Sequence, residues 1–133
     1  MPITSSMTTR LPDILAATLL AALAPAATAA ARTLSGSNAA EALTGSEGPD
    51  KRAGAGGADR IRGLGGDDRI KATSGARSTV QGGDGNDTIT AIIARGKAVI
   101  HCGPGVDTVI ESAYAGNRKR VKLDADCENR KRG

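Results

Sequence analysis

Glycine and aspartate recur along this chain with a period of nine residues, and this period restricts the possible folds more than any other feature. The clearest copy, residues 82–90, reads Gly-Gly-Asp-Gly-Asn-Asp-Thr-Ile-Thr. It matches the nonapeptide pattern G-G-x-G-x-D-x-U-x, where U is a large aliphatic residue, at every defined position. Residues 54–62 and 63–71 match with Ala55 and Leu64 in place of the second glycine. The period therefore predicts a stack of similar units.

Weaker copies extend the pattern in both directions. Residues 36–44 carry Glu41 at the aspartate position, and residues 45–53 carry Asp50 there. Residues 102–110 form a further copy in which Cys102 replaces the first glycine. Two eroded segments, 72–81 and 91–101, separate the good copies, are slightly longer than nine residues and lack the aspartate. We treat each eroded segment as one unit of the stack.

The apolar content of the chain is too small for a conventional core. Leu, Ile and Val together number 23 of the 133 residues, Phe and Trp are absent, and a single Tyr is the only aromatic residue. Hydrophobic burial alone cannot order a chain of this composition. Either the chain stays disordered, or a bound ligand or metal supplies part of the ordering free energy.

The first 31 residues are typical of a secretory signal peptide. Arg10 precedes an apolar segment at 14–27, and small residues offer A-x-A cleavage sites at 27–29 and 29–31. A membrane anchor is the alternative, but the apolar segment is short and Pro25 interrupts it. We therefore expect export, with no membrane span left after cleavage. Because an exported chain meets an oxidising compartment, its only two cysteines, Cys102 and Cys127, are expected to form a disulfide.

These motifs resemble the hemolysin-type, or RTX, calcium-binding nonapeptide repeat family. The closing residues, from Cys102 to Val109 and then Asp126-Cys127-Glu128, resemble the end of its short exported bacterial forms. The resemblance implies an all-β fold, a right-handed parallel β-roll (a β-solenoid) over residues 32–128, closed at its C-terminal end by the disulfide. Residues 129–133 would follow as a basic tail. In this family the first six residues of a repeat form a turn that binds Ca²⁺, and the last three form a short strand.

The repeat chemistry agrees with calcium. Glycines permit left-handed backbone and close approach, and each turn offers carbonyl oxygens and a carboxylate, which are hard ligands. The aliphatic residue of each strand should point inward. The expected core is Leu34, Leu43, Ile61, Ile70, Val80, Ile89 and Val109. Arg52 occupies one of these inward positions and breaks the pattern.

One coil of a β-roll is two nonapeptides, so that successive turns alternate between two edges. Counting units from Gly36 gives an even edge, with Asp50, Asp68, Asp87 and Asp107, and an odd edge, with Glu41 and Asp59 followed by the eroded turns. In those turns Arg77 or Ser78, and then Arg95 or Lys97, would stand at the acidic position. We expect three ions on the even edge and at most one weak ion on the odd edge. The glycines expected beside the ions are Gly63, Gly66, Gly82, Gly83, Gly85, Gly103 and Gly105.

The leading functional prediction is a secreted, non-enzymatic calcium-binding module. A disordered Gly/Asp-rich surface spacer, and a remnant repeat module of a secreted toxin or enzyme, are the alternatives. The single histidine, His101, has no recognisable nucleophile partner, which argues against catalysis. A net charge of +4 without aromatic stacking residues argues against nucleic acid as a partner. Basic residues at outward strand positions favour solubility, with binding of anionic cell-envelope polymers as the alternative.

Overall fold

The computed structural model describes residues 30–133, except 75 and 114–115. The predicted signal peptide therefore lies outside the described residues, apart from its last two positions. Within the part of the chain that is described, no helix is long and apolar enough to cross a membrane.

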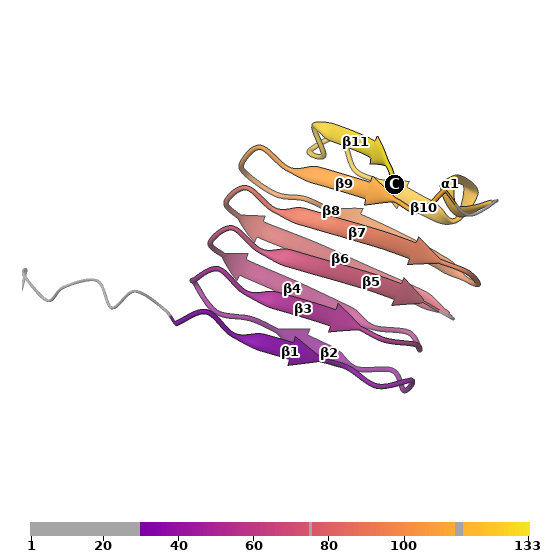
Figure 1. Ribbon diagram of the computed structural model, residues 1–133, viewed down its shortest axis with the longest axis horizontal. Coiled ribbons are helices and arrows are strands. Elements are labelled where there is room, and N and C mark those ends of the chain that lie inside the picture. Colours follow the sequence, from indigo (N-terminus) through magenta and orange to yellow (C-terminus); the bar gives the residue numbers. More distant parts are fainter. Residues whose placement is uncertain (1–29, 75, 114–115) are drawn as a thin grey trace, which may run out of the picture.

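The chain winds into stacked coils, each of which contributes one strand to each of two parallel sheets (Figure 1). Sheet A has six strands in the order β1-β3-β5-β7-β9-β11, and sheet B has five in the order β10-β8-β6-β4-β2. The strands of sheet A are β1 (Thr33–Ser35), β3 (Lys51–Gly54), β5 (Arg69–Ser74), β7 (Thr88–Ile93), β9 (Thr108–Glu111) and β11 (Asn129–Arg132). Those of sheet B are β2 (Ala42–Thr44), β4 (Arg60–Gly65), β6 (Arg77–Asp84), β8 (Lys97–His101) and β10 (Val121–Leu123). The predicted parallel β-roll is confirmed.

The strand register sets one inward column of side chains in each sheet. In sheet A, Ile70 pairs with Ile89 and Ile89 with Val109, and in sheet B Ile61 pairs with Val80. These five predicted core residues are buried. Leu34 and Leu43 are half-buried because they lie in the first coil, where no further coil covers them. The same register confirms that each eroded segment counts as one unit of the stack.

Seven apolar residues outside the predicted set complete the core of the described chain. They are Ala72, Ala91, Ile93, Ala98, Ile100, Cys102 and Val121. Ala72 and Ala91 form a second inward position in β5 and β7, two residues beyond the motif aliphatic. The strands β5, β6 and β7, which run into or lie in the eroded segments, are longer than those of the first coil, β1 and β2. The eroded segments thus lose turn residues and gain strand, which adds buried apolar area where the roll is thickest.

The prediction of a basic C-terminal tail at 129–133 is wrong in one respect. Most of these residues form a strand. Asn129–Arg132 forms β11, which pairs with β9 in sheet A. Arg130 aligns with Val109 in the inward column, and its Nε and Nη2 atoms donate to the carboxylate of the buried Glu111 at 2.8 and 2.6 Å. A motif-based boundary missed this strand because it carries no nonapeptide signature.

A short helix closes the other sheet at the same end. The helix α1 (Asn117–Arg120) leads directly into β10. The buried Asn117 accepts a hydrogen bond from the Ile93 backbone N–H at 2.8 Å and donates to the Ala91 carbonyl at 3.3 Å. Polar groups at the end of β7 therefore have partners, although the pairing of β7 with β9 ends at Ala91.

Left-handed backbone recurs at the second position of the repeat. Gly83 has a φ of 112° and Gly103 one of 99°, and Leu64, which pairs with Gly83, has a φ of 82°. Leu64 is the only residue other than glycine with positive φ in the part of the chain that the structure describes. The turn geometry is therefore retained where the motif glycine is not, at a conformational cost of about 1 kcal/mol.

Candidate metal centre

The even-edge carboxylates stack in one column, as the count of repeats predicts. Strand pairing places Asp50 beside Asp68, Asp68 beside Asp87, and Asp87 beside Asp107 on successive coils. All four aspartates are buried. The register of β9 with β11 brings Glu128 beside Asp107 as the last member. We call these five residues the carboxylate ladder.

One oxygen of each carboxylate in the ladder has a structural role. The backbone N–H of Asp50 donates to Oδ1 of Asp68 at 2.7 Å, and the N–H of Asp68 donates to Oδ1 of Asp87 at 2.8 Å. The N–H of Asp87 donates to Oδ1 of Asp107 at 2.7 Å, and the Asp107 N–H to Oε2 of Glu128 at 2.9 Å. These hydrogen bonds join neighbouring coils at the turns, just before the strands of the sheet begin to pair.

The second oxygens of two of these carboxylates are buried without a partner. The Oδ2 atoms of Asp87 and Asp107 are two of the three buried polar side-chain atoms without a hydrogen-bond partner among the described residues. A buried polar atom without a partner costs about 1–3 kcal/mol, and a charged one costs more. Their burial is therefore hard to explain in a stable metal-free roll, whereas a bound cation would offset it.

Beside Asp68 and Asp87, glycines without a side chain let oxygen atoms of neighbouring coils approach each other. A Cβ atom on Gly63 would lie 2.5 Å from Oδ2 of Asp68 and would overlap the carbonyl oxygen of Gly82. A Cβ atom on Gly82 would overlap Oδ2 of Asp87 and the carbonyl oxygen of Cys102. We call the space beside each of these glycines, together with the matching space beside Gly45, a cradle. Each cradle brings together a carboxylate oxygen and a carbonyl oxygen of the next coil, which are the oxygen ligands that Ca²⁺ takes.

Burial and mutual repulsion shift the titration of the ladder. Burial raises the pKa of Asp87 to about 7, the Asp68 N–H partly opposes the rise, and the charges of Asp68 and Asp107 add to it. Burial also raises the pKa values of Asp68 and Asp107. Burial alone would raise the pKa of Asp50. Hydrogen bonds from Ser46 and from the Arg32 N–H outweigh this effect, and the net result is a lowered pKa. The middle of the ladder thus holds carboxylates that resist ionisation unless a cation is bound.

These shifts predict a pH dependence of the metal-free roll. The folded roll holds the Asp87 proton up to about pH 7, whereas the unfolded chain releases it near 3.8, the ordinary pKa of an aspartate. The folded state binds more protons in between, so raising the pH through this window lowers stability. In chelator, β structure should be greater at pH 5 than at pH 8 by circular dichroism, and Asp87→Asn should reduce the difference. Equal β content at both pH values would contradict this electrostatic account.

The odd edge lacks most of these features. Glu41 donates its N–H to Oδ1 of Asp59 at 3.1 Å, and Asp59 donates its N–H to Oγ of Ser78 at 3.1 Å. Ser78 therefore stands at the acidic position, as one of the two predicted alternatives had it. In the next coil Ala98 aligns with Ser78, so the prediction of Arg95 or Lys97 there is wrong.

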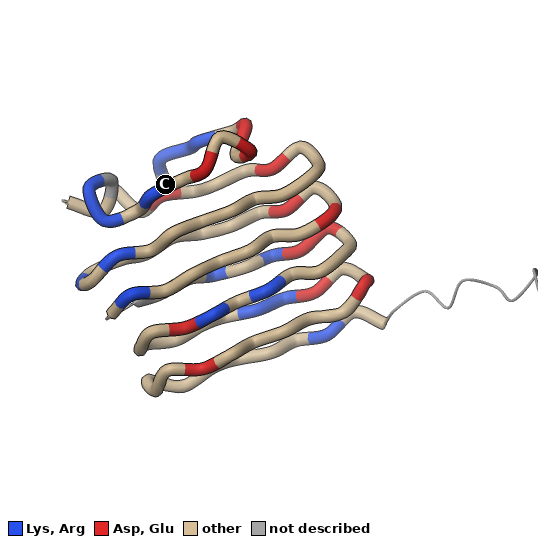
Figure 2. Tube along the Cα trace, turned by 180° about the vertical axis from the view of Figure 1, so that it is seen from behind, with Lys and Arg blue, Asp and Glu red and all other residues tan. Residues whose placement is uncertain are grey.

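The space beside Gly54 on this edge is also less suited to a cation. Its nearest atoms are Cδ1 of Ile61 at 2.8 Å and Oδ2 of Asp59 at 2.9 Å, so a methyl group stands where the even edge has a carbonyl oxygen. Figure 2 shows the difference between the edges, with acidic residues on successive coils at one edge, and acidic followed by basic residues at the other. The even edge is therefore the stronger candidate.

The remaining turn glycines bring coils close together. A Cβ atom on Gly66 would lie against Gly48 and Pro49, one on Gly85 against Gly66, and one on Gly105 against Gly85. Gly83 and Gly103 make similar approaches to Leu64 and Gly83. These predicted site glycines therefore belong to the turns of the even edge, where they allow the coils to stack. Whether their carbonyl groups bind metal stays a prediction.

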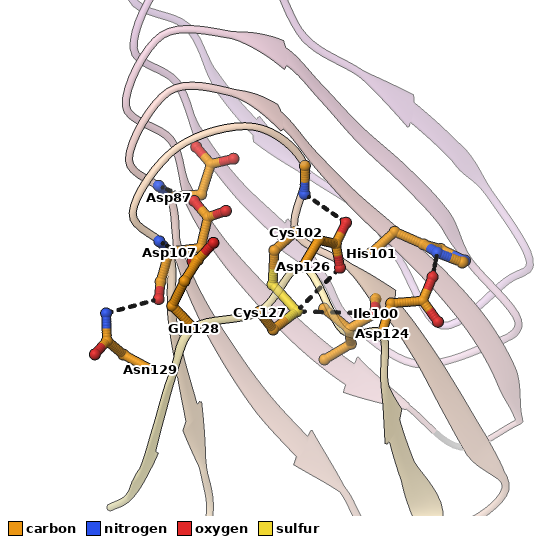
Figure 3. The surroundings of a disulfide bond; sticks show 11 residues. Asp87, Ile100, His101, Cys102, Asp107, Asp124, Asp126, Cys127, Glu128 and Asn129 are labelled. Carbon is orange, nitrogen blue, oxygen red and sulfur yellow. Dashed lines mark hydrogen bonds and ion pairs between the residues drawn. A yellow bond between two sulfur atoms is a disulfide. The ribbon is translucent and has the colours of Figure 1, made fainter.

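The disulfide joins the last nonapeptide to the closing segment, as predicted (Figure 3). Cys102 and Cys127 are bonded, with their Cα atoms 5.2 Å apart. The bond holds Asp126, whose Oδ2 accepts the Gly103 N–H at 2.9 Å, and places Glu128 on the ladder. Beside it, Nδ1 of His101 pairs with Asp124. The closing segment thus supplies to the last turn what a further repeat would supply.

The basic residues predicted to point outward are exposed on the strand faces. They are Lys51, Arg60, Arg62, Arg69 and Lys71.

Comparison with known families agrees with the geometry. A family model for the RTX calcium-binding nonapeptide repeat matches residues 35–70, 53–76 and 74–91, with 4 copies. Searches of curated proteins and of solved structures return no match. Two parallel sheets wound coil upon coil, with stacked carboxylates at the turns, define the chain as a parallel β-roll. Its repeats over residues 35–91 are similar to the RTX calcium-binding nonapeptide repeat family.

Proposed function

We propose that the protein is an exported, non-enzymatic module whose roll is folded by Ca²⁺ bound along the carboxylate ladder. The observation that carries the proposal is the pair of buried Oδ2 atoms, on Asp87 and Asp107, that have no hydrogen-bond partner. A bound Ca²⁺ would supply the positive charge that these carboxylates lack. Oδ2 of Asp68 with the carbonyl oxygen of Gly82 would hold one such ion, and Oδ2 of Asp87 with the carbonyl oxygen of Cys102 would hold a second.

Support for ligand-driven folding comes from the thinness of the core. Of the residues that the structure describes, only 12 apolar ones are buried, and three of these are alanines. Repulsion between stacked carboxylates acts against the metal-free roll, at about 1 kcal/mol per pair in water and several times more where solvent is excluded. Metal binding would therefore contribute directly to the free energy of folding.

Calcium binding should be measurable directly by equilibrium dialysis of the purified protein. We expect half-saturation at a free Ca²⁺ concentration on the order of 10⁻⁴–10⁻³ M, the range of extracellular modules. Mg²⁺ should bind far more weakly, because it requires a smaller octahedral site and loses its water reluctantly. No binding at 10 mM Ca²⁺, or equal binding of Mg²⁺, would contradict the proposal.

The exposed basic residues do not require a second function. They are spread over the outer faces of both sheets. Lys51 and Arg69 lie on paired strands of sheet A, and Arg60 and Arg62 lie on one strand, β4, of sheet B. Solubility of a roll whose turns are acidic explains them. Binding of an anionic cell-envelope polymer is the alternative, and it would use the same faces.

A further inference from the structure

Arg52 is the one charged residue of β3 that points into the roll. It lies in the inward column of sheet A, aligned with Leu34 on one side and Ile70 on the other. Its side chain is 0% exposed. A buried guanidinium in a narrow apolar core would be strongly destabilising unless its charge were matched by acceptors.

The acceptors of Arg52 are atoms of the carboxylate ladder and its turns. Nη2 contacts Oδ2 of Asp50 at 2.5 Å, and Nη1 contacts Oδ2 of Asp68 at 3.1 Å. Nη2 also donates to the carbonyl oxygen of Gly63 at 3.1 Å. One positive charge therefore links two neighbouring carboxylates and a turn carbonyl, while Nε faces the core without a partner.

The Arg52 guanidinium lies in the cradle beside Gly45. A Cβ atom on Gly45 would overlap Nη2 of Arg52 and would lie 2.6 Å from Oδ2 of Asp50. The oxygens around this cradle, Oδ2 of Asp50 and the Gly63 carbonyl, are of the same kinds as those at the Gly63 and Gly82 cradles. Three equivalent spaces thus lie between successive turns of the even edge, and a side-chain cation fills the first.

We propose that Arg52 is a tethered cation that takes the place of one calcium ion at the first cradle. Two ions, beside Gly63 and Gly82, then complete the even edge, in place of the three that the count of aspartates alone predicts. The inference rests on the proposed calcium function and specifies its stoichiometry. It also divides the roll into two parts. The contact between the turns of Asp50 and Asp68 needs no metal, whereas the contacts between the later turns of the ladder do.

The chemistry of arginine suits this substitution. Its guanidinium stays charged at every physiological pH and offers several donors in one plane, which allows it to contact two carboxylates and a carbonyl together. Because it is part of the chain, its local concentration does not depend on free Ca²⁺. The first turns of the ladder can therefore pair in conditions where the later turns are still unpaired.

The test is the number of Ca²⁺ ions bound per chain, measured by equilibrium dialysis. All variants carry Asp59→Asn, so that the odd edge does not contribute. The parent should bind two ions. Arg52→Ile, which restores the residue type of Ile70, should bind three, and Arg52→Ile combined with Asp50→Asn should return to two. Arg69→Ile, which removes an exposed arginine one coil along, is the matched control and should bind two.

Stability in chelator gives a second measurement. Arg52→Ile should lose residual β structure without Ca²⁺, because Asp50 and Asp68 then repel each other without a counter-charge. Arg52→Met, which keeps an unbranched apolar stem, serves if the isoleucine variant does not fold. Three ions in the parent, or no added ion in either variant, would overturn the role of Arg52. A parent that binds no Ca²⁺ would instead overturn the proposed function.

Discussion

Replacing Asp87 by Asn is expected to raise the Ca²⁺ concentration for half-maximal folding at least tenfold, equivalent to about 1.4 kcal/mol or more. The substitution removes the charge beside the Gly82 cradle but keeps an oxygen that can accept the Asp68 N–H. The loss of affinity therefore reports on the metal ligand and not on the hydrogen bond between coils. Circular dichroism during a Ca²⁺ titration measures the midpoint.

The same substitution should have the opposite effect in chelator. Without Ca²⁺ the Asp87 carboxylate is a buried group with its Oδ2 unpaired, so a neutral amide removes a destabilising charge. Asp87→Asn should then be as stable as the parent or more so at pH 8. A residue with a purely structural role would lose stability in both conditions.

Asp59→Asn is the matched control on the odd edge. Asp59 occupies the same motif position, but its coil neighbours are Glu41 and Ser78, and a methyl group of Ile61 lies in its glycine space. We expect its midpoint to shift by less than about threefold, or 0.7 kcal/mol. A shift as large as that of Asp87→Asn would mean that both edges bind calcium equally, and the assignment of the edges would be wrong.

Reduction of the Cys102–Cys127 disulfide should lower the melting temperature of the calcium-bound roll by on the order of 10 °C. The bond closes a chain segment with a sequence separation of 25, which corresponds to about 3.5 kcal/mol in the chain-entropy model. Its loss frees the segment that carries Asp126 and Glu128, so that β10 and β11 are held only by strand pairing, packing and the Arg130–Glu111 ion pair. Calorimetry with and without reductant measures the shift.

Calcium binding itself should survive reduction, because the Asp68 and Asp87 carboxylates lie on earlier coils. A variant with Cys102→Ser and Cys127→Ser is the control, and its melting temperature should not respond to reductant. An unchanged melting temperature for the reduced parent would contradict the capping role. Complete loss of Ca²⁺ binding would show that the disulfide supports the ladder itself.

The nine-residue period predicted a stack of similar units with an inward column of aliphatic residues, and the resemblance to the RTX repeat family implied the β-roll. Together they predicted the stacking of Asp50, Asp68, Asp87 and Asp107. Period and register are linked, because each turn must return the chain to the same sheet position. The eroded segments kept this link, since each still spans one strand and one turn. A bound ion between those aspartates remains a prediction from donor chemistry.

Features that depend on tertiary contacts were not readable from the repeat. Arg52 departs from the pattern in the sequence, and only the structure shows that its guanidinium reaches Asp50 and Asp68. β11 and the place of Glu128 on the ladder follow from the path of the closing segment, which no period describes. Ala98 in place of an acid follows from a register shift of one residue in an eroded turn.

Far-UV circular dichroism of the purified protein in chelator and in millimolar Ca²⁺ tests the central claim most directly. The account predicts a largely unfolded spectrum in chelator at pH 8 and a gain of β structure with a midpoint on the order of 10⁻⁴–10⁻³ M Ca²⁺. Mg²⁺ at the same concentrations should not produce the gain. Equal β content in chelator and in millimolar Ca²⁺ would contradict the claim that calcium folds this roll.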